Sequence, residues 1–320
     1  MEFSKICDMK KGLTVTGFYL VKTAAIKSSI NGNTNYGDYT LADETGEMNG
    51  KLWDVAEPES CPQAGSIIKL QGLVNEYQGR LQLRIDKFRE ATSDDPVDAA
   101  SLVPAAPMDA GQMLEAVGQY AARITNDGLR TLVTTVLDEQ REKLLIWPAA
   151  TRNHHSVRSG LLYHTLTMLR TADAIRGVYA YLQPDLLYAG VILHDMAKLF
   201  ELNATNTGIA GDYTRDGMLL GHIVQGILYV QQVAERVGLD PSLTALVQHM
   251  LLSHHYEPEY GSPRRPMFPE AEVLHFLDIL DARLYDMHKA LEDTQPGRFS
   301  EKLWTLHNRQ LYRMTEDERP

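Results

Sequence analysis

The stretch AGVILHDMAKLFEL, residues 189–202, places a His and an Asp side by side in an otherwise apolar run, with Lys198 close behind. Burying such side chains costs free energy unless they are paired or bound to something. Histidine is the commonest metal ligand in proteins, and a buried Asp needs a cation nearby. His194 and Asp195 are therefore candidates for a metal site, and Lys198 is the first alternative partner for the carboxylate.

The histidines are distributed very unevenly along the chain. All eleven follow residue 153, in a region where the apolar spacing is helical almost everywhere. This pattern predicts an all-α domain over residues 109–320. Because helical domains build metal sites from side chains on facing helices, we expect its inward-pointing polar residues to converge. The candidate ligands are His164, His194, Asp195, His222, His254, His255 and Asp278.

The candidates divide into two groups around one carboxylate. A carboxylate has two oxygens and can bridge two ions, whereas an imidazole cannot, so Asp195 is expected to be the bridging ligand. His164, His194 and Asp278 would complete one metal position, and His222 and His254, with His255 as a further candidate, the other. Nitrogen and oxygen ligands without thiolate suit Mn, Fe, Co, Ni or Zn. The alternative for any single histidine is a core residue with an ordinary hydrogen bond. We expect structural or surface roles for His249, His275, His288 and His307.

In the first 92 residues, apolar and polar side chains alternate in short segments instead of following a helical spacing. Short alternating segments cover residues 13–26, 36–43, 47–54, 66–77 and 80–88, and turn residues separate them. Five short strands in this order predict a small OB-fold β-barrel over residues 1–92. The stretch 93–108 is rich in Asp, Pro and Ala and predicts a linker.

Strand alternation also indicates a binding face on the barrel. If Leu52 points into the interior, Lys51 and Trp53 point to the opposite face. On OB folds, bases of single strands stack on aromatic rings and their phosphates lie near basic residues. We expect Tyr36, Trp53 and Tyr77 to stack and Lys51 to contact phosphate. The alternative for Trp53 is packing against the helical domain.

Composition limits the class of protein. The chain has 320 residues, 44% of them hydrophobic, which is enough for two ordinary domains. A net charge of −11 argues against nonspecific coating of nucleic acid, but a metal-dependent enzyme can still act on phosphates. Two widely spaced cysteines, Cys7 and Cys61, fit a reducing compartment, and no apolar run is long enough to span a membrane. We therefore expect a cytoplasmic protein.

The order of His164, His194-Asp195 and Asp278 resembles the HD superfamily of metal-dependent phosphohydrolases, and His222 and His254 are similar to those of its two-metal branch. An OB fold followed by NHHSVRSGLLYHT (153–165), LLYAGVILHDMAKLFEL (186–202), GHI (221–223) and SHHYEPEYGSPRRP (253–266) is similar to the YhaM group of bacterial 3'-5' exoribonucleases. Tyr163 stands where that group usually has Glu. We expect this change to affect metal preference or rate without removing a ligand.

The resemblance implies hydrolysis of single-stranded RNA, or of single-stranded DNA, from the 3' end to nucleoside 5'-monophosphates by a metal-activated water. It implies two divalent transition-metal ions, with manganese expected first. Asp195 and Lys198 would be catalytic, and Arg264 and Arg265 would grip backbone phosphates. Two rivals stay open: a nucleotide or cyclic-nucleotide phosphohydrolase, and a noncatalytic nucleic-acid-binding regulator with a structural metal site. Homo-oligomerisation is left open, and no membrane partner is expected.

Overall fold

The computed structural model describes residues 3–28, 34–55, 57, 61–77, 79–92, 94–97, 99–151, 154–205, 208–292 and 294–318. The chain forms two compact units. The first comprises residues 1–105 with 205–209, and the second comprises residues 106–204 and 210–320. Among the described residues, no helix combines the length and the apolar character that crossing a membrane requires.

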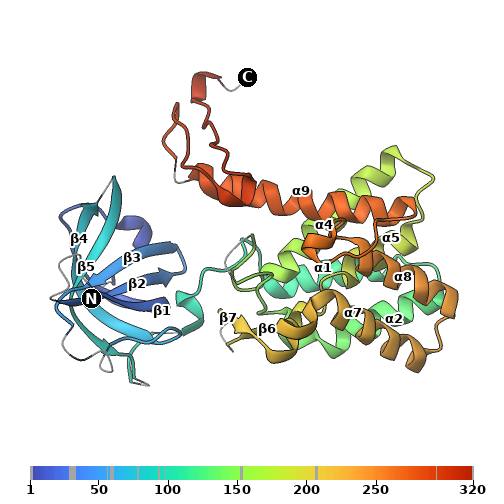
Figure 1. The fold of residues 1–320 in the computed structure, drawn as a ribbon, viewed down its shortest axis with the longest axis horizontal. Coiled ribbons are helices and arrows are strands. Elements are labelled where there is room, and N and C mark those ends of the chain that lie inside the picture. The colour runs from blue at the N-terminus through green and yellow to red at the C-terminus, as the bar shows by residue number, and fades with distance from the viewer. Residues whose placement is uncertain are drawn as a thin grey trace. The chain divides into compact units, whose positions relative to one another are not determined.

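The first unit is a closed five-stranded barrel (Figure 1). Its strands are β1 (Thr14–Ser28), β2 (Asn35–Asp43), β3 (Gly46–Leu52), β4 (Ile67–Tyr77) and β5 (Arg80–Glu90). They follow the order β1-β2-β3-β5-β4, and β4 pairs with β1 to close the ring. All neighbours are antiparallel except β3 and β5, which pair in parallel from Asn49–Gln82 to Lys51–Arg84. This is the five-stranded OB-fold barrel that the alternation predicts.

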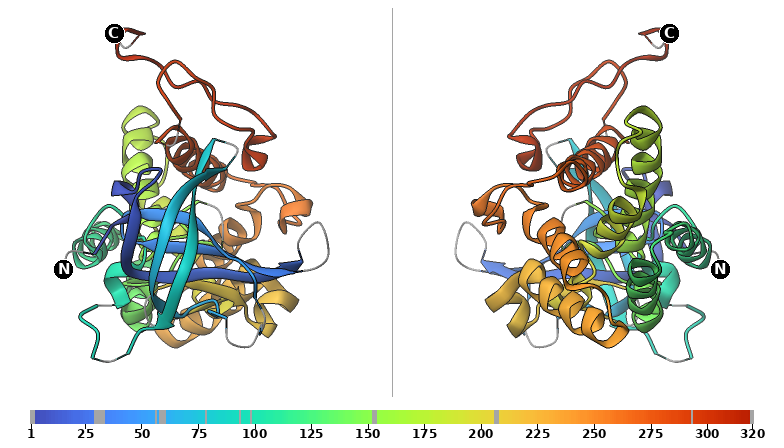
Figure 2. Two further views of the ribbon diagram at one scale, coloured as in Figure 1. Left: turned by 90° about the vertical axis from the view of Figure 1, so that its left-hand side faces the viewer. Right: turned by 90° about the vertical axis from the view of Figure 1, so that its right-hand side faces the viewer.

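The barrel interior is filled by alternate residues of the strands, including Val15, Tyr19, Leu41, Ile68 and Leu83. In the left view of Figure 2 the strands cross one another steeply, as closure of so small a barrel requires. The segment predicted as a linker is partly packed. Leu102 and Val103 are buried in a cluster with Phe18 and Leu20, and the boundary between the two units falls after Ala105.

The second unit is helical, as the apolar spacing predicts. Its helices are α1 (Ala110–Ala122), α2 (Asp127–Glu139), α3 (Arg141–Leu144), α4 (Gly160–Val178), α5 (Pro184–Leu193), α6 (Lys198–Glu201), α7 (Arg215–Val237), α8 (Pro241–Ser253) and α9 (Pro269–Glu292). Side-chain caps fix several starts: Asp109, Asn126, Thr214 and Asp240 each accept a hydrogen bond from a backbone N–H of the first turn. One continuous apolar core joins α1, α2, α4, α5 and α7–α9.

Several local features of this unit are absent from the sequence prediction. A short hairpin, β6 (Leu202–Ala204) and β7 (Ala210–Tyr213), interrupts the helices. After α9, residues 294–318 form no α-helix, and isolated β-bridges join Phe299 to Tyr312 and Leu303 to Arg309. The run predicted as one helix around His194 is broken, because α5 ends at Leu193 and α6 begins at Lys198. The helix α7 is also kinked at Gly221, whose φ of 68° is a backbone conformation that glycine adopts without strain.

Candidate functional site

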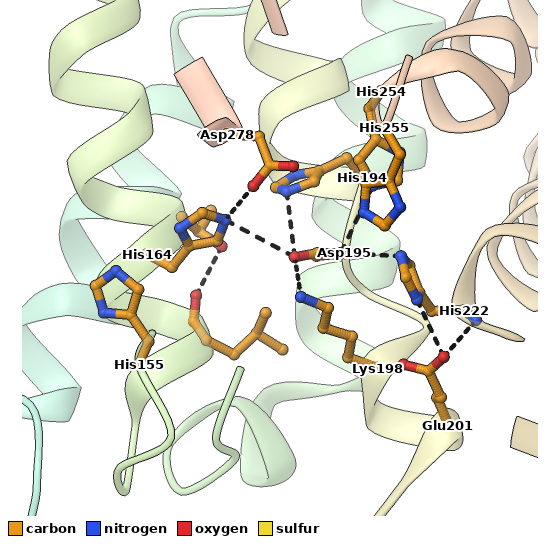
Figure 3. Close-up of polar contacts among 12 residues, drawn as sticks. His155, His164, His194, Asp195, Lys198, Glu201, His222, His254, His255 and Asp278 are labelled. Carbon is orange, nitrogen blue, oxygen red and sulfur yellow. Dashed lines mark hydrogen bonds and ion pairs between the residues drawn. The ribbon is translucent and has the colours of Figure 1, made fainter. Parts of the chain in front are cut away.

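The candidate ligands lie where the helices end or bend. His194 and Asp195 occupy the turn that follows α5, and His254 is the residue directly after α8. His222 follows the kink of α7, while His164 lies in the first turns of α4. Helix ends and kinks can direct neighbouring side chains into one space between elements. Here the side chains of these histidines surround Asp195 (Figure 3).

Asp195 lies at the centre of the cluster, and its two oxygens face different partners. Oδ2 lies 3.3 Å from Nε2 of His194 and 3.8 Å from Nε2 of His164. Oδ1 lies 3.6 Å from Nε2 of His222 and 4.0 Å from Nε2 of His254. Two ligands held about 2.1 Å from one ion are themselves about 3.0 to 3.4 Å apart for octahedral or tetrahedral angles. The spacing therefore fits ligands that share cations better than groups that bond to each other.

Five buried polar atoms of the cluster have no hydrogen-bond partner among the described residues. Within the part of the chain that the structure describes, this holds for Oδ1 of Asp195 and for Nε2 of four rings, those of His164, His194, His222 and His254. Side chains this deep normally have every polar atom bonded. Five converging orphan atoms, all of them electron-pair donors when the rings are neutral, fit divalent metal ions.

The opposite nitrogen of each ring is held in place. Nδ1 of His194 and Nδ1 of His254 lie 2.8 Å from the carbonyl oxygens of Val191 and Leu251. Nδ1 of His222 lies 3.1 Å from Oε1 of Glu201. These acceptors require the proton on Nδ1, so the lone pair of Nε2 points into the cluster.

Electrostatics support neutral rings at His254 and His255 and an ionised carboxylate at Asp195. Burial holds the pKa of His254 well below its usual value, and the rings of His255 and His194 act in the same direction. Burial also lowers the pKa of His255. At Asp195 burial opposes ionisation, but Lys198 and His194 outweigh it and keep the carboxyl pKa well below its usual value. Neutral imidazoles and an ionised carboxylate are what metal ligation requires.

His164 differs from the other rings because two carboxylates approach it. Its Nε2 lies 3.3 Å from Oδ1 of Asp278, and its Nδ1 lies 2.7 Å from Oδ2 of Asp281. Burial opposes the charged ring, but Asp278 and Asp281 raise the pKa of His164 to about 9. A cation at Nε2 would therefore displace a proton.

Lys198 makes the ion pair that its spacing from Asp195 suggests. Its Nζ lies 2.7 Å from Oδ2 of Asp195, and the lysine side chain is 12% exposed. Burial opposes the ammonium, but the charges of Asp195 and Asp278 outweigh it and raise the pKa of Lys198. The lysine is thus a fixed positive charge at the edge of the cluster, and a catalytic role for it stays a prediction.

The ring of His255 lies beside those of His222 and His254, and the two arginines follow it in the chain. Nδ1 of His255 lies 2.6 Å from the carbonyl of Tyr260, and suitable atoms of His222, His254 and His255 fall within 4.8 Å of one another. Arg265 stacks over the ring of Tyr256 at 5.0 Å and pairs with Glu257 at 3.3 Å. Arg264 is exposed. A phosphate contact of either arginine stays a prediction.

The barrel residues predicted to bind nucleic acid are only partly brought together. The rings of Tyr36 and Trp53 lie 5.1 Å apart, and Trp53 is 49% exposed, while Leu52 packs against the barrel core. Lys51 lies over the ring of Tyr36, but its Nζ is 2.7 Å from Asp38, so the ammonium is already paired.

Tyr77 lies at the end of β4 and is 63% exposed. No ring contact joins it to Tyr36 or Trp53 among the residues described. A cavity of about 260 Å³ opens beside Trp53, lined also by Leu52, Val55, Cys61 and Phe88.

Three residues around the cluster were not predicted from the sequence. Glu201 accepts hydrogen bonds from both the backbone N–H and the ring of His222. Asp281 accepts from His164, and His155 reaches the same carboxylate. A Glu or Asp on a helix usually belongs to its solvated face, so only the doubled histidine at 154–155 offered a signal.

A known protein family matches the helical part of the chain. Residues 161–283 match the family model described as the HD domain, which spans the cluster from His164 to Asp278. Residues 161–283 form an HD domain. The HD-domain family consists generally of metal-dependent phosphohydrolases.

Two of the solved structures similar to this chain are described as OB-fold domains. The second OB-fold domain of replication protein A from Methanococcus maripaludis is 21% identical, with a TM-score of 0.24, and the match covers 30% of this chain and 98% of that one. An OB domain from Thermoplasma acidophilum is 15% identical, with a TM-score of 0.23, and covers 30% and 90%. Scores this low carry no information on ligands, and the OB fold here follows from the strand order of the barrel itself.

Proposed function

We propose that this protein is a metal-dependent 3'-5' exoribonuclease that degrades single-stranded RNA to nucleoside 5'-monophosphates, with single-stranded DNA as the alternative substrate. The observation that carries the proposal is the convergence of Oδ1 of Asp195 and four imidazole Nε2 atoms, all buried and unbonded among the described residues. The HD domain supports phosphoester hydrolysis, and an OB barrel with the exposed Trp53 beside the partly buried Tyr36 supports a single-stranded substrate.

The candidate ligands would form two metal positions. His164, His194 and Asp278 would hold one divalent ion, and His222 and His254, with His255 beside them, would hold a second, with Asp195 between the two. Bound divalent ions lower the pKa of water and offset charge on phosphate oxygens. We propose manganese, with iron, cobalt, nickel or zinc as alternatives.

The ammonium of Lys198 is a positive charge that the protein itself can place beside the phosphate. When the bond between the 5' phosphorus of the terminal nucleotide and O3' of the preceding nucleotide breaks, that 3' oxygen leaves with negative charge and needs a proton. Lys198 is positively charged, and its Nζ lies beside Oδ2 of Asp195. We propose that it protonates this oxygen or holds a nonbridging oxygen of the same phosphate. Arg264 and Arg265 would hold phosphates further along the strand.

The test is an assay of purified protein on single-stranded RNA labelled at either end, with manganese and with or without chelator. We expect the 5'-labelled strand to shorten stepwise and the 3'-labelled strand to release a labelled mononucleotide at once, both only with metal. Hydrolysis of mononucleotides or cyclic nucleotides alone would favour the nucleotide phosphohydrolase. Binding without cleavage would favour the regulatory protein.

Assembly into a homo-oligomer is a further proposal that one observation supports. Phe276, Leu280 and Leu284, spaced four residues apart on α9, are 57%, 45% and 56% exposed. A helix that is apolar on its outer as well as its inner face is usually covered. Light scattering on the purified protein gives the mass that decides this.

A further inference from the structure

A single carboxylate oxygen joins two histidines at the edge of the cluster. Oδ2 of Asp281 lies 2.7 Å from Nδ1 of His164 and 2.7 Å from Nε2 of His155. Asp281 follows Asp278 by three residues on α9, so both carboxylates lie on one face of that helix. Asp278 approaches Nε2 of His164, and Asp281 approaches Nδ1.

His155 is held more tightly than a surface histidine. It is 1% exposed, and its ring lies 4.0 Å from the ring of Tyr285 and 5.5 Å from that of Tyr163. Its backbone is in the left-handed region, with φ of 53°. A non-glycine residue pays for that conformation, which persists only when the surroundings fix it. The surroundings do so here: its carbonyl accepts from Ala149, and the backbone of Gly160 lies too close to that carbonyl for any β-carbon.

We propose that His155 is a positioning residue of the metal centre, which acts through Asp281 to fix the tautomer and orientation of His164. A carboxylate oxygen can accept from both rings at once. With one partner the carboxylate could turn about its side-chain bonds; with two, it is fixed. A fixed acceptor at Nδ1 keeps the proton there and leaves the lone pair of Nε2 for a metal. The inference rests on the proposed function only in treating His164 as a ligand.

This arrangement also gives Tyr163 a role. The resemblance to the exoribonuclease group places Glu at this position, directly before the first metal histidine. Here the ring of Tyr163 packs edge-on against His155, at an interplanar angle of 66°. The ring of Tyr285 lies on His155 as well, at 40°. The two tyrosine rings and the carboxylate of Asp281 thus help to fix the position of the His155 imidazole.

The experiment measures manganese binding by the full chain, with free Mn²⁺ followed by electron paramagnetic resonance. His155→Phe keeps an aromatic ring but cannot donate to Asp281, and we expect it to weaken one manganese site about 10-fold or more. His155→Gln places a donor close to the position of Nε2, and we expect it to restore most of the affinity. His288→Phe is the matched control, because His288 lies on α9 but is 77% exposed and pairs only with Glu292 among the described residues.

A double-mutant cycle tests whether His155 acts through Asp281. In an Asp281→Asn background, His155→Phe should cause little further loss, whereas additive losses would overturn the proposal. Unchanged manganese affinity in folded His155→Phe would overturn it as well. If His155→Phe does not fold, the cycle is run with His155→Leu, and loss of folding there too would assign His155 a structural role only.

A measurement without metal separates this inference from the proposed function. Nitrogen-15 NMR of the imidazoles reports which nitrogen of His164 carries the proton when the ring is neutral. We expect Nδ1–H in the wild type and a tautomer mixture in His155→Phe. If the wild type bound no metal at all, the proposed function would fail, yet the tautomer shift would still support the positioning role. An unchanged tautomer would overturn it.

Discussion

Oδ1 of Asp195 and Nε2 of His222 face each other at 3.6 Å, a distance too long for a hydrogen bond. Neither atom has a hydrogen-bond partner among the described residues, although both are buried. Nδ1 of His222 is held by Glu201, so the ring cannot turn without losing that contact. Both groups offer lone pairs to the same space, where a cation would stabilise them.

Replacing Asp195 by Asn should abolish turnover. The amide keeps the size of the side chain but removes the negative charge between the two ligand groups. Because removing an outer partner of a ligand already costs 10- to 100-fold, we expect the loss in kcat to exceed about 100-fold. RNA retention in a filter-binding assay should be largely unchanged. Turnover close to wild type would remove Asp195 from the site.

Metal binding should stabilise the HD domain selectively. Without a cation the five orphan atoms are buried and unsatisfied, which costs free energy of folding. At manganese concentrations about 100 times Kd, the expected gain is about 2.7 kcal/mol for each ion bound. Calorimetry should show the transition of the helical unit moving up with Mn²⁺ and back with chelator, while the transition of the barrel stays. Equal shifts of both transitions would indicate nonspecific binding.

Lys198→Gln separates catalysis from pairing. If Lys198 protonates the leaving oxygen, kcat should fall about 100-fold or more, as for loss of a general acid. Manganese affinity should stay equal or rise, because a cation next to Asp195 is gone. Lys143→Gln is the control, since Lys143 donates to the carbonyl of Leu199 and lies outside the cluster. A stability loss with unchanged kcat would leave Lys198 as an ion-pair partner only.

The fold could be predicted because apolar residues recur along the sequence with the period of a strand or of a helix. Alternation over 9 to 15 residues marks β1 and β2, and helical spacing marks α9. The hairpin β6–β7 could not be predicted, since strands of 3 and 4 residues are too short to carry a period.

The seven candidate ligands could be named from the sequence because histidines and aspartates stand out in apolar helical segments. The structure brings these seven side chains together, and metal binding by them stays a prediction. Their partners Glu201 and Asp281 were not recognisable. A carboxylate on a helix normally belongs to the solvated face, and only the tertiary fold brings these two against His222 and His164. The same holds for Lys51: its spacing predicts an outward face, but its pairing with Asp38 depends on the register of β2 with β3.

Trp53→Ala should weaken capture of long strands more than of dinucleotides. Trp53 is half exposed and lies 5.1 Å from Tyr36, so the pair can stack bases that reach the barrel. Stacking on an aromatic ring contributes about 1 to 3 kcal/mol per base, which predicts a rise in KM of roughly 5- to 150-fold on long RNA. Trp304→Ala, at a 70% exposed tryptophan of the helical unit, is the control. Equal losses on dinucleotides would assign Trp53 a packing role.

Asp38 should make the barrel sensitive to acid. Burial opposes its ionisation, but hydrogen bonds from Lys27, Lys51 and Asn49 lower its pKa from 3.8 to about 2. Because the folded-state pKa is depressed, the stabilisation is fully present above about pH 4 and is lost as the pH falls towards 2. Asp38→Asn should therefore lower the free energy of unfolding by about 1 to 2 kcal/mol at pH 6, with the difference from wild type shrinking by pH 3.

Urea unfolding measures this difference. Trp147 and Trp304 are replaced by Phe, so that Trp53 fluorescence reports on the barrel alone. Asp86→Asn is the matched control, because Asp86 lies on the same barrel but its pair with Arg84 is exposed, and exposed pairs contribute little. If Asp38→Asn and wild type differed equally at pH 6 and pH 3, ionisation of Asp38 would not be the cause. The effect would then come from its side-chain hydrogen bond with Asn49, which does not need the charge.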